Sequence, residues 1–283
     1  MSVTPLKAAI RPPLVDGLFY PAKREALAAQ IDDLLSRSEV PRAARFAVIS
    51  PHAGYEYAGE VMAAAYRAIA LRPVRTAVLI GPVHRDPEEG IFLPESTSFN
   101  TPLGQVPVDT EASASLMARD PLFRRNDIPH LEEHCLELQL PFLARLFPGV
   151  SIVPLLLGSS GMDMVAALSR SLRLTFANSA DYTVFIVSAN MASYMTGKNV
   201  ERESAAIEEL LGQGDWRGMV SAGERRLISA CGVAGMAAVL CLAGEGCQVE
   251  VLARAHSQAR DEDESRVVHY AAVSVDTGSR AFE

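Results

Sequence analysis

The 283-residue sequence lacks a basic run of the kind that binds nucleic acid, and its formal net charge is -8. A chain of this charge, with a pI of about 5.4, repels phosphate backbones on average, so we expect no nucleic-acid partner. Cysteines are also few, four in all, and they form neither a C-x-x-C pair nor a closely spaced framework. This pattern does not suit a disulfide-stabilised secreted protein and favours reduced thiols in the cytoplasm.

Long apolar segments are equally scarce. The first 17 residues contain no apolar core of the kind found in signal peptides. The stretch from Leu227 to Gly244 is uncharged for 18 residues, which is close to the length of a membrane-spanning helix. Because it is rich in alanine, glycine and serine and contains two cysteines, we interpret it as a buried core helix. We therefore expect a cytoplasmic protein that does not enter a membrane.

Two apolar patterns alternate along the chain: continuous short runs, and residues spaced by three and four. Short continuous runs predict buried strands at Phe46–Ser50, Thr76–Gly81, Ser151–Leu157 and Tyr182–Ser188. Weaker strand signals lie around 91–94 and 104–108, and two final strands are predicted at 248–253 and 267–275. Apolar residues spaced by three and four predict helices at about 25–36, 61–68, 132–146, 164–172, 200–211 and 227–242. Four prolines make an extended conformation the expectation for the first 22 residues.

This alternation predicts an α/β fold with three layers, α/β/α, around a central mixed, largely parallel sheet. No internal repeat or low-complexity linker divides the sequence, so we expect a single domain over residues 1–283. In such sheets ligands bind beyond the carboxyl ends of the strands. The residues that follow each strand are therefore the first candidates for a functional site.

Histidines follow two of the predicted strands. His52 comes two residues after the first strand, in SPHAGY, and His84 comes soon after the second, in GPVH. Two imidazoles at neighbouring strand ends are a candidate metal site, because neutral imidazole suits iron, copper and zinc. The alternative for each residue is a loop histidine held by a structural hydrogen bond.

Three further residues are candidates. Cys231 lies at the start of the predicted apolar helix, where N–H groups and the helix dipole favour a thiolate; a small buried core thiol is the alternative. His134 and Glu137 lie three residues apart on one face of the predicted helix 132–146, with Glu133 beside them. A histidine–carboxylate pair can orient a ligand or transfer a proton, whereas an exposed charged stripe is the alternative.

The motifs RPPLVDGLFYPA, ISPHAGYEYAG, IGPVH, NTPLGQVPVD, EEHCLELQLPFL, VPLLLG and SACG resemble those of the Memo family, in the same order. They begin at Arg11 and cover nearly the whole chain. The resemblance implies a fold related to class III extradiol dioxygenases and a metal site formed by His52, His84 and Cys231. It also implies a divalent metal, iron first with copper or zinc as alternatives, a small-molecule ligand and a radical-SAM partner protein. It favours a place in the pocket for the catalytic candidates His134 and Glu137.

One motif departs from the family. The usual SSDFSHY is replaced by SANMASY, so that Asn190 stands in place of the acid and Ser193 in place of the histidine. Neither side chain titrates near neutrality, so proton transfer from this loop is lost. We therefore expect a metal-binding protein with a dioxygenase-like pocket that lacks classical extradiol ring cleavage. The alternatives are a non-haem iron dioxygenase or oxidoreductase acting on a small aromatic substrate, and a metal-free partner-binding scaffold.

Overall fold

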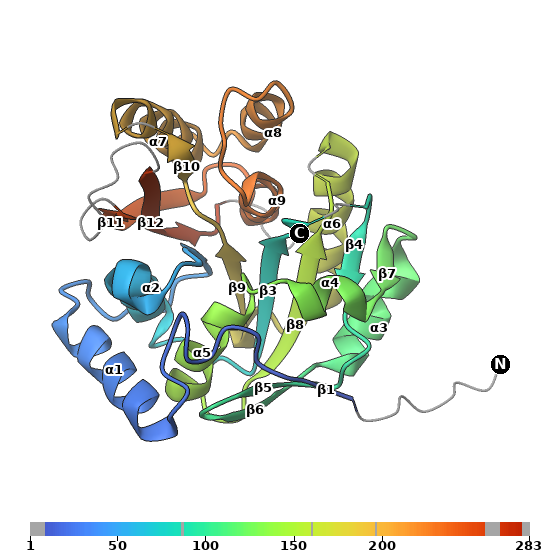
Figure 1. Cartoon of the computed structure of the whole chain (residues 1–283). Helices are drawn as coiled ribbons and strands as arrows, with labels where there is room; N and C mark the ends of the chain where they lie inside the picture. The colour runs from blue at the N-terminus through green and yellow to red at the C-terminus, as the bar shows by residue number, and fades with distance from the viewer. Residues whose placement is uncertain (1–8, 86–87, 160, 196, 258–266, 279–283) are drawn as a thin grey trace.

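A computed structural model describes residues 9–85, 88–159, 161–195, 197–257 and 267–278. Within these residues a nine-stranded mixed sheet crosses the molecule in the order β10-β12-β2-β9-β3-β8-β4-β7, with β11 paired to β12 (Figure 1). Its strands are β2 (Ala47–Ser50), β3 (Thr76–Pro82), β4 (Ile91–Leu93), β7 (Phe123–Arg125), β8 (Ser151–Leu157), β9 (Thr183–Ser188), β10 (Ala192–Met195), β11 (Gln248–His256) and β12 (Val267–Asp276). The central strands β2, β9, β3 and β8 are parallel neighbours. The predicted α/β fold with a mixed sheet is confirmed.

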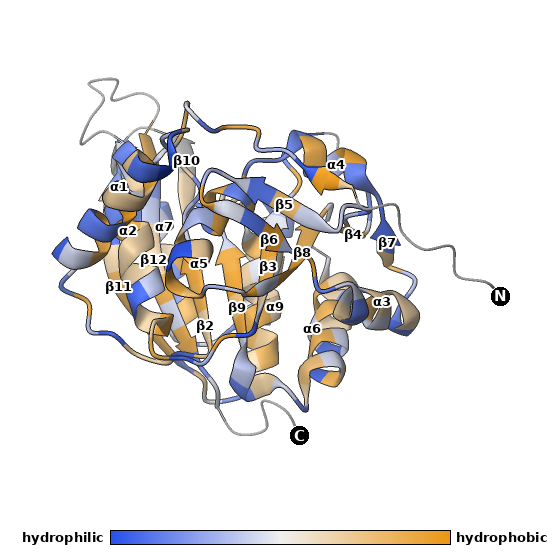
Figure 2. Ribbon diagram, turned by 90° about the horizontal axis from the view of Figure 1, so that it is seen from below, coloured by the Kyte–Doolittle hydropathy of each residue, from blue (hydrophilic) through white to orange (hydrophobic). Residues whose placement is uncertain are grey.

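Helices cover both faces of this sheet. Successive side chains of a strand point to opposite faces, so Val78 and Ile80 belong to one apolar cluster and Ala77 and Leu79 to the other. Helices α3 (Thr110–Arg119), α6 (Met162–Phe176), α7 (Gly197–Gly212), α8 (Trp216–Glu224) and α9 (Val233–Ala243) contribute to the first cluster. Helices α1 (Arg24–Arg37), α2 (Tyr55–Ile69) and α5 (Leu140–Leu146) contribute to the second. Figure 2 shows the apolar strands between these two layers.

A second, three-stranded sheet is formed by β1 (Ile10–Arg11), β5 (Ser98–Thr101) and β6 (Gly104–Pro107), in the order β1-β5-β6. Its apolar residues Phe99 and Val106 belong to the second cluster, so it packs on the face that α1, α2 and α5 cover. The first 22 residues were expected to be extended, and this expectation is confirmed for β1. The extended conformation ends at a turn in which the N–H of Gly17 donates to the carbonyl of Tyr20. Residues 1–8 lie outside the described part of the chain.

The predicted helix 132–146 is correct for its C-terminal half, where α5 ends at Leu146, and wrong for its N-terminal half. Helix α4 (Asp127–Glu132) ends where that helix should begin, residues 133–136 are not helical, and the one-turn 3₁₀ helix η1 (Glu137–Gln139) leads into α5. Pro141 explains the late start of α5, because proline lacks an N–H and is suited to the first turn of a helix. His134 and Glu137 therefore do not share the face of one helix.

The apolar helix begins at Val233 rather than at Leu227, so Cys231 lies in a loop two residues before it. Gly232 lies against the end of β9, where an added Cβ would come within 2.3 Å of the Cβ of Ala189. This close approach brings the loop that carries Cys231 onto the carboxyl end of the sheet. No helix in the described part of the chain is long and apolar enough to cross a membrane.

Candidate metal centre

The carboxyl ends of β2 and β3 place two histidines side by side. The four strands predicted as the core of the sheet pair in register, and His52 and His84 leave them at the same edge. Their ring centroids are 5.2 Å apart and the rings are nearly perpendicular, at 79°. The predicted juxtaposition of the two imidazoles is therefore confirmed.

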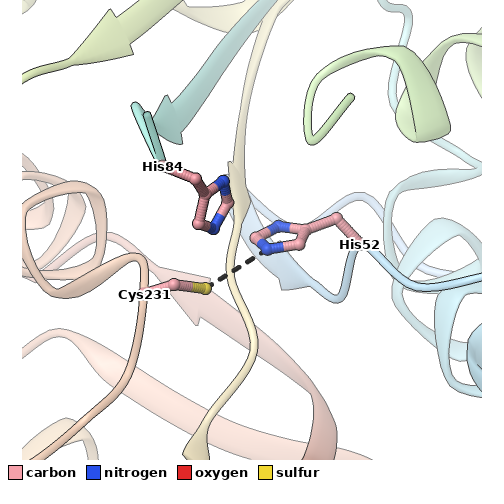
Figure 3. A group of neighbouring side chains, drawn as sticks. All are labelled: His52, His84 and Cys231. Atoms are coloured by element: carbon pink, nitrogen blue, oxygen red, sulfur yellow. Dashed lines mark hydrogen bonds between the residues drawn. The ribbon is translucent and has the colours of Figure 1, made fainter. Parts of the chain in front are cut away.

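Cys231 completes a three-residue cluster with these histidines. Its Sγ lies 3.3 Å from Nε2 of His52, and one ligand atom from each of the three residues falls within 4.8 Å of the others (Figure 3). The cysteine approaches from the loop before α9, whereas the histidines come from the sheet. Two imidazole nitrogens and a thiolate are a donor set that suits iron, copper and zinc. The residues present thus fit a transition-metal ion.

Ser188, the last residue of β9, sets the orientation of His52. The Ser188 hydroxyl donates to the carbonyl of Cys135 at 2.7 Å and lies 3.0 Å from Nδ1 of His52. With its proton directed to that carbonyl, Oγ accepts from Nδ1–H of His52 and also from the side-chain amide of Gln139, at 3.2 Å. When the ring of His52 is neutral, its lone pair is then on Nε2, the nitrogen that faces Cys231.

Glu133 orients His84 as Ser188 orients His52. One carboxylate oxygen lies 2.9 Å from Nδ1 of His84 and the other accepts from the main-chain N–H of the same residue. Hydrogen bonds with Cys231 and Glu133 raise the pKa of His84 to about 10. Burial pushes the pKa of Glu133 upward, but the hydrogen bonds and charge of His84 outweigh it and lower that pKa. Such a carboxylate fixes the tautomer of a metal-ligating histidine.

The surroundings of Cys231 favour its ligand form. Burial raises the pKa of a thiol, but the charge and hydrogen bond of His52, a hydrogen bond from His84 and the main-chain N–H of Asn190 outweigh it. The net effect lowers the pKa of Cys231 from 9.0 to about 6. The N–H of Asn190 donates to Sγ at 3.1 Å. A thiolate, the form that binds metals, is therefore the main species at neutral pH.

His134 also lies at this centre. Its ring is stacked on that of His84, with centroids 5.8 Å apart, and meets the ring of His52 edge-on at 5.9 Å. Phe19 packs against its other side, at 5.3 Å. Neither ring nitrogen has a hydrogen-bond partner within the described part of the chain. Burial and the charge of His52 lower the pKa of His134 to about 4, so it is a neutral and weak base at pH 7.

Glu137, by contrast, anchors the N-terminal segment. Its side chain is fully buried and accepts hydrogen bonds from Arg11 and from the hydroxyl of Tyr20, both at 2.7 Å. The main-chain N–H groups of Leu14 and Val15 donate to the same carboxylate. The structure thus brings His134 to the cluster of His52, His84 and Cys231 and assigns Glu137 to this anchor. Because the helical path stops after α4, Glu133 is the carboxylate that forms a hydrogen bond with a histidine, His84.

The two residues that depart from the family pattern have different places. The side-chain oxygen of Asn190 accepts from the main-chain N–H of His52, at 3.2 Å. Asn190 therefore supports the loop of His52 through its side chain and the thiolate through its main chain. Ser193 lies in β10, and its side chain is outside the described part of the structure.

A second group of donors shares His84. One ring nitrogen of His84, a carboxylate oxygen of Glu133 and Sγ of Cys135 also fall within 4.8 Å of one another. Cys135 is fully buried and its thiol donates to the carbonyl of Pro82, at 3.4 Å. Burial raises the pKa of that thiol well above 9, so Cys135 is a much poorer ligand than Cys231.

Comparison with known proteins extends the resemblance found in the motifs. The family model described as "Memo-like protein" matches residues 11–274. A MEMO1 family protein of Sulfolobus acidocaldarius is 32% identical over 281 residues, covering 93% of this chain and 98% of its own length. The MEMO1 family proteins of Aeropyrum pernix and Methanosarcina acetivorans are 31% and 30% identical; each comparison covers 94% of this chain and 99% of the relative.

Proposed function

The chain belongs to the Memo family, and from this premise we propose that it is a metal-binding protein whose ion is held by His52, His84 and Cys231. The observation that carries the proposal is the convergence of three ligand atoms within 4.8 Å of one another. The separate hydrogen-bond partners of the two Nδ1 atoms add to it, because they leave both Nε2 atoms for the ion.

We propose iron as the metal, with copper or zinc as alternatives that the same donors accept. When bound, iron or copper would supply redox chemistry and an electrophilic centre at this end of the sheet. The protein's own residues hold the donors ready: Ser188 and Glu133 fix the imidazoles, and the N–H of Asn190 stabilises the thiolate. A thiolate in place of a carboxylate ligand shifts the preference toward softer metals.

Classical extradiol ring cleavage is not part of the proposed function. Such chemistry needs a base beside the metal, and positioned bases contribute about 10²–10⁴-fold to rate. Asn190 cannot titrate, and the pKa of about 4 makes His134 a weak proton acceptor at neutral pH. The pocket that the resemblance relates to the dioxygenases would therefore lack their acid–base residues at positions 190 and 193.

A second candidate function is an oxidoreductase or dioxygenase for a small aromatic molecule, with His134 as a relocated base. The contact of His134 with the rings of both His52 and His84 favours it. A metal-free partner-binding scaffold has less support, because it does not account for the convergence of the ligand atoms of His52, His84 and Cys231. The radical-SAM partner protein and the cytoplasmic location stay predictions from the sequence.

The test of the proposed function is the metal content of the protein purified without oxygen and then reconstituted with iron, copper or zinc. We expect about one ion per chain in the wild type. His52→Ala, His84→Ala and Cys231→Ala should each lose stoichiometric binding, while Cys247→Ala, a half-buried thiol outside the cluster, should retain it. Full occupancy in the three cluster variants would refute the assignment.

A further inference from the structure

Two histidines outside the candidate metal centre form a cross-strand pair in the main sheet. His256 is the last residue of β11 and lies directly opposite His269 of β12 in their antiparallel pairing. Residues paired in this way point to the same face of the sheet, with Cβ atoms about 4.5–5.5 Å apart. Two imidazoles at this spacing can reach one ion, because each zinc–nitrogen bond is about 2.0–2.1 Å long.

The histidine pair faces helix α7. His269 comes two residues before Ala271, which belongs to the first apolar cluster, so both point to the face that α7, α8 and α9 cover. On β11, Arg254 comes two residues before His256 and donates to the carboxylate of Glu208 in α7. Both rings therefore lie on the side of α7, the helix that contacts β10, β11 and β12 (Figure 1).

The packing of α7 on β12 includes two buried polar groups without partners. Val200 of α7 and Val267 of β12 belong to one small apolar cluster. Ser204 lies one turn further along the helix, and His269, with 9% of its surface exposed, is the next residue on the same face of the strand. Oγ of Ser204 and Nδ1 of His269 are buried and have no hydrogen-bond partner in the described part of the chain. Unpaired buried groups of this kind indicate a place where a water molecule or an ion binds.

The charges around the pair are compatible with a cation. Burial has the largest effect on His269 and lowers the pKa of its ring from the ordinary 6.5, so the ring is a neutral ligand at pH 7. The carboxylates of Glu201 and Glu208 lie close enough to act on the charge of this ring. Arg254 is neutralised by Glu208, to which it donates hydrogen bonds of 2.8 and 2.6 Å. His256 is exposed, so its ring can turn toward His269 and an ion can enter from solvent.

We propose that His256 and His269 bind one divalent transition-metal ion, with zinc as the representative, between α7 and the paired strands β11 and β12. Two imidazoles select zinc, copper or nickel over magnesium and calcium, which prefer oxygen ligands. Water completes the coordination of the ion. The cluster of His52, His84 and Cys231 offers three ligands, one of them a thiolate. The histidine pair is therefore the weaker site, and its ion is lost when excess metal is removed.

The test is a zinc titration of the full-length, metal-free protein at pH 7, followed by calorimetry and by NMR of the histidine rings. We expect a tight phase and a weaker phase of about one ion per chain each, and the ring signals of His256 and His269 should change in the weaker phase. Magnesium should not change these signals. Unchanged signals at saturating zinc, or equal changes with magnesium, would overturn the proposal. Loss of the tight phase alone would keep the histidine pair and remove the centre at Cys231.

Three variants assign the weaker phase to its residues. His256→Ala and His269→Ala should each weaken it at least tenfold and leave the tight phase unchanged. His256 is exposed, so its variant keeps the test valid if His269→Ala does not fold. Glu250→Gln is the matched control, because it removes an exposed carboxylate from the opposite face of β11 and should change neither phase. An unchanged weaker phase in His256→Ala, or equal weakening in Glu250→Gln, would overturn the assignment to the histidine pair.

Discussion

Two polar residues behind the histidines decide which nitrogen each ring presents. Ser188 binds Nδ1 of His52 and Glu133 binds Nδ1 of His84, so both rings turn Nε2 toward Cys231. The two residues orient the rings in different ways. The Ser188 hydroxyl is itself fixed by its hydrogen bond to the carbonyl of Cys135, whereas Glu133 also accepts a hydrogen bond from the main-chain N–H of His84. The candidate site is therefore organised by residues outside the proposed ligand set of His52, His84 and Cys231.

Removal of the Ser188 hydroxyl tests this organisation. We expect Ser188→Ala to weaken metal affinity 10–100-fold, the usual effect of losing a partner that orients a ligand, while the three ligands remain. Nitrogen chemical shifts of His52 in the metal-free protein, at a pH at which the ring is neutral, should report a loss of the pure Nδ1–H tautomer. This second measurement separates an orienting role from a general loss of stability.

Ser50 provides the matched control for that variant. It is directly opposite Ser188 in the pairing of β2 with β9 and is equally buried, but its hydroxyl has no hydrogen-bond partner in the described structure. Ser50→Ala should leave both the affinity and the His52 tautomer unchanged. Equal effects of the two substitutions would contradict the role given to Ser188.

At the scale of elements, the N-terminal segment is tied to the 3₁₀ helix before α5 by one buried ion pair. Arg11 and Glu137 are almost wholly buried, and the guanidinium also donates to main-chain carbonyls of His130 and Glu133. This anchor positions Phe19, whose ring packs on His134. The segment thus covers one side of the candidate metal centre through the contact of Phe19 with His134.

We expect Arg11→Met to lower the free energy of unfolding by about 3–5 kcal/mol, because it leaves the buried Glu137 carboxylate without its opposite charge. Urea unfolding measures the change. Arg145→Met is the control, since the pair of Arg145 with Asp32 is half exposed, and it should cost no more than about 1 kcal/mol. Similar costs for the two variants would show that Arg11 is not an anchor.

The segment that follows β9 carries the departure from the family pattern. With Asn190 in the loop after β9 and Ser193 in β10, the iron-reconstituted wild type should cleave catechols slowly or undetectably. Asn190→Asp/Ser193→His restores the family residues and should raise the rate by up to about 10²–10⁴-fold. Rapid ring cleavage by the wild type that is lost in His134→Ala would instead make this protein an enzyme with a relocated base.

The elements of the sheet could be read from the sequence because they are buried on both faces. Continuous apolar runs predict β2, β3, β8 and β9 to within one residue at either end. Strands β7 (FRR) and β10 (ASYM) were not predicted, because neither contains a continuous apolar run. Periodicity also runs unbroken across 132–146, and it does not reveal that Pro141 starts a new helix or that residues 133–136 leave the helical path.

The same limits apply to the site. His52 and His84 follow strands that can be recognised, so their meeting could be predicted from topology. Cys231 required the family motif, because its loop is placed by a close approach of Gly232 to Ala189 that no pattern reveals. The sequence could not show that Glu133, rather than Glu137, contacts a histidine, because both residues fall on the one helix predicted over 132–146. Ser188 could have been identified as a candidate from the sequence, because it is a polar residue at the end of a buried strand.

For the whole molecule, buried neutral histidines make stability depend on pH. Burial, with a contribution from the charge of Arg11, lowers the pKa of His130 to about 4 from an ordinary value of 6.5. The unfolded chain therefore takes up this proton first as the pH falls. Stability is fully present above pH 6.5 and is lost between pH 6.5 and 4.

Urea unfolding of the metal-free protein at pH 7 and pH 5 measures this effect. His130 alone should reduce the free energy of unfolding by about 2 kcal/mol between these values. His130→Gln should remove that part of the pH dependence, whatever its effect on absolute stability, and His256→Gln, at an exposed position of β11, should leave it unchanged. The same pH dependence in wild type and His130→Gln would contradict the assignment.

The central claim is that one ion occupies the point between His52, His84 and Cys231. The most direct measurement is anomalous diffraction from crystals of the iron-reconstituted protein. We expect one strong anomalous peak per chain, in contact with both Nε2 atoms and with Sγ of Cys231. A peak between Nδ1 of His84, Glu133 and Cys135, or no peak at either group of donors, would contradict the account.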